Sequence, residues 1–483
     1  MGLLSLAIWT PIFFGVVLLA LGRDEQAGAV RWIALIGALA GLFATFPLMA
    51  NFVPGTADIQ FVEKLSWIER FNVQYFLGVD GLSFWFVPLT AFITVVVVIA
   101  GWEVITERVN QYMAAFLILS GLMIGVFAAL DGLLFYVFFE ATLIPMYFLI
   151  GGFGGPRRSY AATKFLLFSL AGGLIMLASV IGLYGQSVSA NGQASYLLSD
   201  LAAINISGDI GRWLMAGFLI AFIIKAPMVP LHTWLPDAAE EATPGTSVLL
   251  VGVLDKIGTF GMIKFCLGLF PDASRWVAPV MIVLALVSIL WGALAAIGSK
   301  NLMRLVAYTS VSHFGFMVLG IYAMTTAGIS GTVFYMLNHG FSTAALFLVV
   351  GYLIKRAGTA DVDAFGGAQK LVPVLSGVFL LAWLSALGLP GLSSFVSEFM
   401  VLAGQPEGRQ PGRVRLARVP QRHDRPGDRA FGRALHRTRP DRRREARHGA
   451  DPGRPAVPRL LSAAGRAAGR TDRDRGDATR GRR

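Results

Sequence analysis

The stretch Phe218-Leu-Ile-Ala-Phe-Ile-Ile-Lys225-Ala-Pro227-Met-Val-Pro230-Leu-His232-Thr-Trp-Leu-Pro236 decides the fold of this 483-residue chain. Seven apolar residues precede the lysine, and three prolines lie within the ten residues 227–236. Each proline removes a backbone donor and crowds the carbonyl four residues before it. The stretch therefore predicts an apolar helix that is interrupted beside a lysine at membrane depth.

The composition of the whole chain is that of a membrane protein. Hydrophobic residues make up 55% of it and charged residues only 14%, whereas soluble domains carry about 25% charged residues. These figures exclude an ordinary soluble enzyme. Cys266 is the only cysteine, which excludes a disulfide framework and a zinc or iron–sulfur site ligated by cysteines.

The net charge of +12 comes from the C-terminal part alone. Residues 1–404 hold 18 basic and 20 acidic residues, whereas residues 405–483 hold 23 arginines, no lysine and nine acidic residues. We expect disorder in this tail, because it has few apolar residues to bury. A nucleic-acid-binding arm would use both lysine and arginine, so the composition favours a GC-rich gene that is translated out of frame.

Apolar segments long enough to cross a membrane recur along residues 1–404. A hydrocarbon core about 30 Å thick needs roughly 20 apolar helical residues. We therefore predict an all-α, polytopic membrane protein, and the first segment, which has no basic n-region or cleavage site, is a retained helix. The twelve predicted spans cover residues 3–21, 31–52, 82–101, 112–130, 132–150, 162–184, 212–235, 246–268, 276–297, 302–324, 330–354 and 372–404.

Basic residues in the loops indicate the orientation. With the N-terminus outside, eleven lysines and arginines fall on the inside and five on the outside. We therefore predict that the N-terminus lies outside. Residues 53–75 and 186–211 are the longest predicted loops.

Four ionisable residues stand singly at membrane depth, namely Glu140, Lys225, Lys256 and Glu398. Inserting such a side chain at the centre of a membrane helix costs about 2.5–3.5 kcal/mol. Each of the four residues therefore needs a partner, water or a function. A buried Glu–Lys pair could simply fix helix packing. Burial disfavours the charged form of both side chains, whereas each charge stabilises the charge of its partner. A pair in which these two effects balance can gain or lose a proton when a neighbouring group moves. Four such residues in one chain favour a proton relay.

The histidines of residues 1–404 are His232, His313 and His339, and all three lie in or beside predicted spans. A membrane histidine is more often a hydrogen-bond donor between helices than a relay, although its pKa of roughly 6.5 suits proton transfer. A metal site is the weaker interpretation, because no two histidines lie at i, i+4 and no carboxylate lies at ligand spacing.

The last predicted span is interrupted as well, by Gly388-Leu-Pro390-Gly391. Irregular backbone at membrane depth is tolerated only where protein or water satisfies it. A proline kink explains either interruption alone. Two interrupted helices, one in each half of the chain, indicate an ion site in an inverted-repeat transporter.

Several motifs give the chain a resemblance to a known family. It resembles the antiporter-like, proton-pumping membrane subunits of respiratory NADH:quinone oxidoreductase (complex I) over about residues 1–403. Sibling subunits usually carry lysine at position 398, so the glutamate favours the chain M type, the counterpart of mitochondrial subunit 4. The motifs are Lys225-Ala-Pro-Met-Val-Pro-Leu-His-Thr-Trp-Leu-Pro-Asp-Ala238, Gly245-Thr-Ser-Val-Leu-Leu250, Arg304-Leu-Val-Ala-Tyr-Thr-Ser-Val-Ser-His313-Phe-Gly315, Asn338-His339-Gly340, and Gly388-Leu-Pro-Gly391 with Phe395-Val-Ser-Glu398-Phe399.

The resemblance implies fourteen helices built from two inverted five-helix repeats, of which this chain would hold about twelve. Residues 1–111 would form three N-terminal helices and residues 112–268 the first repeat. Residues 276–404 would form a second repeat that lacks its last two helices, followed by the tail 405–483.

The resemblance also implies a role for each candidate residue. Glu140 would pair with Lys225, and Glu398 would be the terminal site toward the outside. Lys256 would pass protons along the midplane. His313 and His339 would assist Lys256. His232 and Asp237 would line the hydrated region near the first break. The residues that would break the helices are Pro227, Pro230, Pro236, Pro390 and Gly391.

By the same resemblance, this chain would be a non-redox translocase subunit in a bacterial inner membrane, without a cofactor of its own. NADH, FMN, iron–sulfur clusters and quinone would belong to partner subunits, and its partners would be antiporter-like membrane subunits and lipid, with no nucleic acid. A cation/proton antiporter or membrane-bound hydrogenase subunit is the alternative, and a nucleic-acid binder acting through the tail is a second one.

Two positions depart from the family pattern. Ala239 stands where many relatives have histidine, and Asp255 stands where an apolar residue is common, directly before Lys256. Adjacent helical residues do not face each other. Asp255 therefore need not neutralise Lys256, but it could alter the electric field around it.

Overall fold

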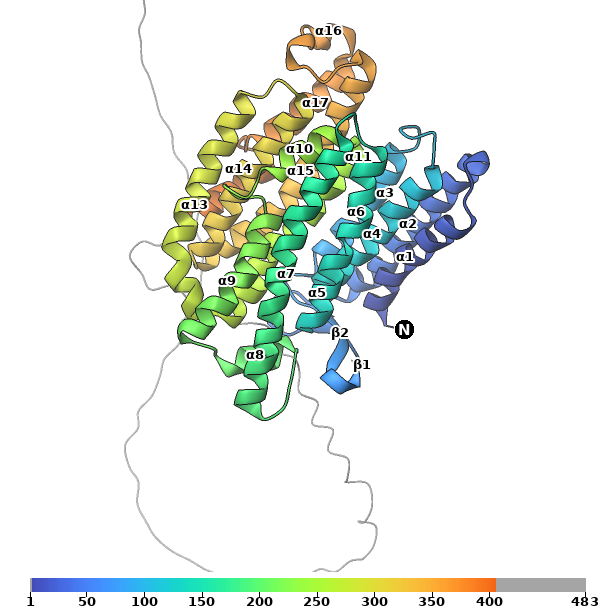
Figure 1. Cartoon of the computed structure of the whole chain (residues 1–483). Coiled ribbons are helices and arrows are strands. Elements are labelled where there is room, and N and C mark those ends of the chain that lie inside the picture. Colours follow the sequence, from blue (N-terminus) through green and yellow to red (C-terminus); the bar gives the residue numbers. More distant parts are fainter. Residues whose placement is uncertain (1, 405–483) are drawn as a thin grey trace, which may run out of the picture. The chain divides into compact units, whose positions relative to one another are not determined.

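A computed structural model describes residues 2–404 of the chain. They form a bundle of helices that run alongside one another, with one two-stranded sheet at one end (Figure 1). The predicted class, an all-α polytopic membrane protein, is confirmed. Our expectation for the tail, residues 405–483, lies outside the described residues.

The element bounds are as follows. The N-terminal third contains α1 (Leu3–Leu21), η1 (Asp24–Gln26), α2 (Ala27–Asn51), β1 (Gln60–Ile68), η2 (Glu69–Phe71), β2 (Val73–Val79), α3 (Phe86–Ala100) and α4 (Val109–Ala128). The middle contains α5 (Gly132–Ala141), α6 (Leu143–Phe153), α7 (Arg158–Asn191), α8 (Leu198–Ile204), α9 (Gly208–Lys225), α10 (Trp234–Glu241), α11 (Pro244–Leu249), η3 (Leu250–Leu254), α12 (Lys256–Gly261) and η4 (Met262–Leu267). The last part contains α13 (Pro271–Ile297), α14 (Leu302–Tyr322), α15 (Thr326–Ala357), η5 (Val362–Ala364), α16 (Ala368–Leu371), α17 (Pro373–Ala386) and α18 (Ser393–Ala403).

Each of the twelve predicted spans falls on a helix or on a run of consecutive helices. Among residues 2–404, eight helical segments are long and apolar enough to cross a membrane, judged by length and composition. The other predicted spans are shorter or interrupted helices, such as α3 and the pair α17 and α18. The number of spans therefore stays a prediction.

The two long predicted loops contain regular structure. Residues 53–75 contribute to the antiparallel hairpin β1–β2, in which Leu65 pairs with Tyr75. The Glu63 carboxylate of this hairpin accepts hydrogen bonds from the amides of Leu4 (2.7 Å) and Ser5 (3.2 Å). These amides have no partner within α1 because they belong to its first turn, so the hairpin caps that helix. The second predicted loop is shortened by the end of α7 and by α8.

Both predicted interruptions coincide with helix ends. The helix α9 ends at Lys225, because Pro227 has no amide hydrogen with which to continue it. A new helix, α10, begins at Trp234, and Pro236 lies in its first turn, where an amide donor is not needed. Pro236 is therefore part of the new helix, whereas Pro227 and Pro230 lie in the gap.

The second interruption separates α17 from α18. Pro390 lies in this gap between Gly388 (φ +64°) and Gly391 (φ +101°). Both glycines occupy the left-handed region that other residues rarely adopt. The sequence Gly-Leu-Pro-Gly therefore supplies the backbone freedom that the break between α17 and α18 needs.

The predicted span 246–268 is an irregular helix. Two π-helical segments, η3 and η4, stand on either side of α12, which begins at Lys256. Such segments have an extra residue per turn and are frequent at functional sites. Hydropathy predicted the span but does not report this hydrogen-bond pattern.

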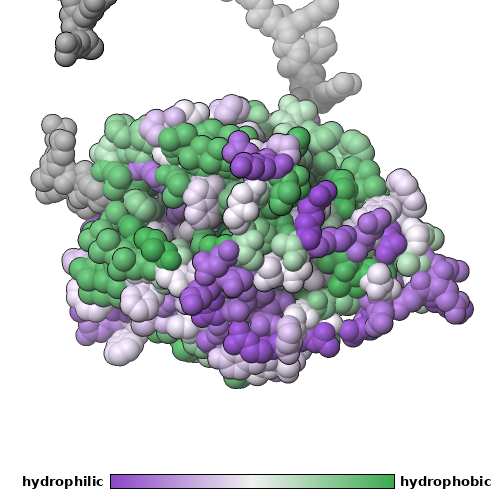
Figure 2. All heavy atoms as spheres, turned by 90° about the horizontal axis from the view of Figure 1, so that it is seen from above, coloured by the Kyte–Doolittle hydropathy of each residue, from purple (hydrophilic) through white to green (hydrophobic). Residues whose placement is uncertain are grey.

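The two ends of the bundle differ. The N-terminus lies at the same end as β1, β2 and α8, and α16 lies at the opposite end (Figure 1). Figure 2 shows hydrophilic residues gathered over part of the end that carries α16, with hydrophobic residues around them. Large apolar side chains on the flank of α13 are exposed, among them Ile297 at 83% and Leu294 at 67%, as expected for a surface that faces lipid.

Candidate functional site

Lys225 is the last residue of α9 and lies inside the bundle, where its side chain is almost fully buried. Its Nζ atom lies 5.0 Å from the centre of the Phe139 ring and 5.8 Å from that of Phe165. It has no hydrogen-bond partner among the described residues. Aromatic faces stabilise a cation by about 0.5–2 kcal/mol, which replaces only part of the lost hydration.

Glu140 stands near the C-terminal end of α5, next to Phe139 of the cage around Lys225. Its carboxylate packs against Gly173 of α7, where a larger residue would overlap it. The Oε1 atom has no hydrogen-bond partner among the described residues. Glu140 and Lys225 interact electrostatically without a direct ion pair in the described part of the chain.

Lys256 begins α12 between the two π segments and is fully buried. Its Nζ atom lies 2.6 Å from Nδ1 of His339 on α15 and donates to the carbonyl oxygen of Val251 at 2.5 Å. The ring of Phe314 covers it at 5.0 Å. The lysine and the imidazole are therefore in direct contact, and a proton can pass between them without an intervening group.

The line of polar groups continues from His339 to the second interruption. The rings of His339 and His313 are 5.0 Å apart, and the ring of Tyr335 lies 5.8 Å from that of His313. The Tyr335 hydroxyl donates to Oε1 of Glu398 at 2.6 Å. Nδ1 of His313 and Nε2 of His339 have no partner among residues 2–404. We call these five residues, with Lys256 first and Glu398 last, the second-half line.

Gly388 ties Glu398 to the break between α17 and α18. A Cβ atom at Gly388 would overlap the Glu398 carboxylate, and the backbone there is left-handed. Asn338, beside His339, donates to the carbonyl oxygen of Ser393 at 3.0 Å and so fixes the start of α18 to α15. The break therefore positions the terminal carboxylate of the line.

Asp237 is placed elsewhere, in a network of ion pairs near the α10 end of the first break. It accepts from Lys164 of α7 and from Arg304 of α14, each at 2.6 Å. Arg304 also contacts Glu240, and Arg157 contacts Glu240 and Glu241. Burial alone would raise the pKa of Asp237, but the hydrogen bonds from the two basic side chains outweigh burial and lower it.

His232 lies inside the gap between α9 and α10. Its Nε2 atom accepts a hydrogen bond from the Trp291 indole at 3.1 Å, and Nδ1 has no partner among the described residues. Its ring lies 6.4 Å from that of Tyr308 on α14. No hydrogen bond or ring contact in the described part of the chain joins it to Lys225 or to the second-half line.

The family of the chain follows from its comparison with known proteins. Residues 129–411 match the family described as NADH:quinone oxidoreductase/Mrp antiporter, TM, over more than half of the chain. The chain belongs to this family. The motifs quoted above had indicated it, and that prediction is confirmed.

Curated proteins named NADH-quinone oxidoreductase subunit M are similar to this chain over most of their length. The NADH-quinone oxidoreductase subunit M of Mycobacterium tuberculosis strain H37Rv is 44% identical over 432 residues, which cover 82% of this chain and 78% of that protein. The subunit of the same name from Rhodobacter capsulatus is 38% identical over 412 residues, which cover 83% of this chain and 80% of that protein.

Two solved membrane complexes contain a chain with the same fold as this one. A chain of respiratory complex I from Thermus thermophilus superposes with a TM-score of 0.75 at 32% identity, covering 83% of this chain and 82% of that one. A chain of the Mrp complex from Dietzia sp. DQ12-45-1b superposes with a TM-score of 0.72 at 24% identity. The match covers 83% of this chain and 73% of that one. The second likeness concerns the fold alone.

The structure adds polar residues that the sequence analysis did not single out. Tyr335 lies one helical turn before His339, and that spacing could have indicated it. Lys264 and Asp80 form a buried ion pair with a 2.6 Å contact. Burial would raise the pKa of Asp80, but Lys264 holds it below its ordinary value. Their partnership joins residues 184 positions apart, so no local signal could have revealed it.

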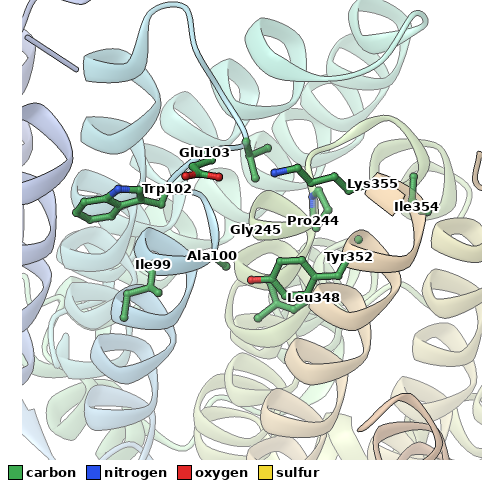
Figure 3. A pocket seen from close by; sticks show the side chains of 12 residues that line it. Ile99, Ala100, Trp102, Glu103, Pro244, Gly245, Leu348, Tyr352, Ile354 and Lys355 are labelled. Carbon is green, nitrogen blue, oxygen red and sulfur yellow. The ribbon is translucent and has the colours of Figure 1, made fainter. Parts of the chain in front are cut away.

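A pocket of about 480 Å³ lies between α3, α11 and α15, and it is separate from the residues described above. The side chains of Glu103 and Lys355 approach it from opposite sides, with Trp102 beside Glu103 and Tyr352 below Lys355 (Figure 3). None of the predicted site residues lines it. Within residues 2–404, no group of three or more potential ligands could hold a metal ion.

Proposed function

We propose that this chain is the proton-translocating membrane subunit of a bacterial NADH:quinone oxidoreductase, of the subunit M type. The observation that carries the proposal is the second-half line, in which Lys256, His339, His313, Tyr335 and Glu398 follow one another inside the bundle. The identity of 44% with a subunit M supports the assignment to this enzyme.

The pair Glu140 and Lys225 would control the entry of a proton into this line. Lys225 lacks a hydrogen-bond partner among the described residues, so its ammonium depends on the Phe139 and Phe165 rings and on the charge of Glu140. A change in the field at Glu140 would alter the proton affinity of Lys225. A proton released there would be passed toward Lys256.

The second-half line would deliver the proton to the outside. Lys256 gives a proton to His339 across their contact, and the histidines and Tyr335 lead it to Glu398. Moving one charge against 100 mV costs about 2.3 kcal/mol. The energy would come from electron transfer in partner subunits, which would hold FMN, iron–sulfur clusters and bound NADH and quinone. This chain would contribute no redox centre.

The arrangement in the membrane is part of the proposal. The chain would lie in the bacterial inner membrane beside other antiporter-like subunits, with its N-terminus outside. Residues 1–111 would precede the first repeat, 112–268, and the second repeat, 276–404. We assign it no nucleic-acid partner, because the excess of basic residues lies in 405–483, where arginines occur without any lysine.

A cation/proton antiporter subunit is the second candidate, since the Mrp complex has the same fold. Such a subunit would exchange protons for a cation without NADH. Membrane vesicles that acidify in response to NADH, and that show no proton movement when a sodium gradient alone is applied, would favour the first candidate.

The proposal is tested by Glu140→Gln in the intact enzyme complex, with Glu107→Gln as the matched control, because Glu107 is exposed. We expect Glu140→Gln to lower proton translocation and quinone-linked NADH oxidation together, on the order of tenfold or more. The control should retain both activities. Full pumping by an assembled Glu140→Gln enzyme would refute the proposal.

A further inference from the structure

Asp255 is a fully buried carboxylate that the function proposed above does not use. Neither Oδ1 nor Oδ2 has a hydrogen-bond partner among residues 2–404. Although Asp255 directly precedes α12, its side chain does not cap that helix, and its backbone is helical (φ −67°, ψ −24°). An uncompensated buried charge is costly, so neither local capping nor packing explains a carboxylate here.

The helix face that carries Asp255 is directed toward the end of α9. Gly258, one turn later, lies against α9, since a Cβ there would stand 2.5 Å from the amide nitrogen of Ala226 and 2.6 Å from the carbonyl oxygen of Phe222. Residues three apart share a helix face. Asp255 therefore faces the region where α9 ends at Lys225.

Lys256 leaves the same backbone in another direction. Successive residues of a helix point about 100° apart, and Lys256 contacts His339 on α15. Asp255 interacts electrostatically with both Lys225 and Lys256. The two neighbours 255 and 256 thus connect the side of the first break with the second-half line.

We propose that Asp255 is a proton-carrying residue between Lys225 and Lys256, an inference that rests on the function proposed above. In the first step the Lys225 ammonium gives its proton to the Asp255 carboxylate, which leaves a neutral amine and a carboxylic acid. In the second step the acid gives that proton to the neutral Lys256 amine, which restores the carboxylate and forms an ammonium. Charge and protons balance in both steps.

The neighbouring groups favour such a cycle. The titratable groups that face this region are Lys225 on α9, Lys256 itself and, beyond it, His339 and His313. Glu140 also interacts electrostatically with Lys225, whereas Asp255 interacts with both Lys225 and Lys256. A carboxylate between two lysines stabilises a proton on either one, and it lowers the barrier to moving a positive charge between them because the charge is never left without a counter-charge.

The test uses the intact complex in proteoliposomes, with Asp255→Asn and, as the matched control, Asp58→Asn at an exposed position. Asparagine keeps the size of the side chain but neither takes up nor releases a proton. We expect Asp255→Asn to lower proton translocation by about tenfold or more, and Asp255→Glu to recover a large part of it. The control should pump like the unaltered enzyme.

Infrared difference spectra on reduction by NADH give a second readout that a merely structural residue would not produce. The unaltered enzyme should show a carboxylic acid C=O band that shifts in D₂O, and Asp255→Asn should lack it. If Asp255→Asn does not assemble, Asp255→Glu must show a displaced band and slower pumping. An unchanged band and rate in Asp255→Glu would then overturn the inference.

Comparison with Glu140→Gln separates the two proposals. An Asp255→Asn enzyme that pumps normally while Glu140→Gln does not would overturn the role of Asp255 and leave the proposed function standing. If both variants pump like the unaltered enzyme, the proposed function itself fails.

Discussion

Tyr335 is the hydrogen-bond donor that connects the histidines of the second-half line to Glu398. Its side chain is fully buried on α15, and its hydroxyl lies 2.6 Å from the carboxylate. Hydrogen bonds to charged groups contribute about 1.5–3 kcal/mol. The hydroxyl therefore favours the ionised form of Glu398 and offers a path for its proton.

We predict that Tyr335→Phe lowers proton translocation by about tenfold, the change expected for loss of one such bond. The phenyl ring keeps the packing, so the complex should assemble normally. The measurement is the number of protons moved per NADH oxidised, followed as a function of pH. Tyr352→Phe on the same helix is the control, and equal pumping by both variants would contradict the prediction.

The sequence indicated the acidic and basic residues of the site better than their partners. Glu140 and Lys225 could be found because a charge in an apolar segment is conspicuous. Tyr335 carries no charge, so only its spacing of one helical turn before His339 could have distinguished it from a packed aromatic residue. The direction of Asp255 depends on the contact between Gly258 and α9, which no sequence pattern reports.

At the scale of elements, ion pairs hold the α10 segment to its neighbours. Asp237 of α10 contacts Lys164 of α7 and Arg304 of α14, so one carboxylate joins elements of both predicted repeats. Its side chain is only 14% exposed, so solvent screens these pairs weakly. Movement of α10 relative to α7 or α14 would strain this contact.

We predict that Asp237→Asn destabilises the complex by about 1.5–3 kcal/mol at neutral pH. The pKa of Asp237 is lowered in the folded protein, so its contribution is complete above the ordinary aspartate pKa and is lost as the pH falls through the lowered value. The difference in melting temperature from the unaltered protein should therefore shrink in acid. Asp209→Asn, at an exposed position, is the control, and a difference independent of pH would contradict the prediction.

Hydropathy predicted the membrane segments but not their internal hydrogen bonding. The apolar runs located the long helices, and the prolines located both interruptions. The hairpin β1–β2 and the π segments η3 and η4 were not predicted, because each depends on pairing between particular backbone groups. Pro236 lies in the first turn of α10, so a proline does not always mark the end of a helix.

The whole molecule has two distinguishable ends, and the orientation prediction concerns which of them faces outward. Basic residues of the loops fall mostly on the side that the positive-inside rule assigns to the cytoplasm. The hairpin and the N-terminus share one end, and α16 lies at the other (Figure 1). Opposite ends of the bundle should therefore be exposed to opposite sides of the membrane.

We predict that a cysteine introduced at Ser66 in the hairpin reacts with a membrane-impermeant maleimide in intact spheroplasts. A cysteine at Gln369 in α16 should react only after the membrane is permeabilised. Both positions are exposed, and Cys266 is fully buried, so its background reaction should be low. Labelling at Gln369 alone would place the N-terminus inside.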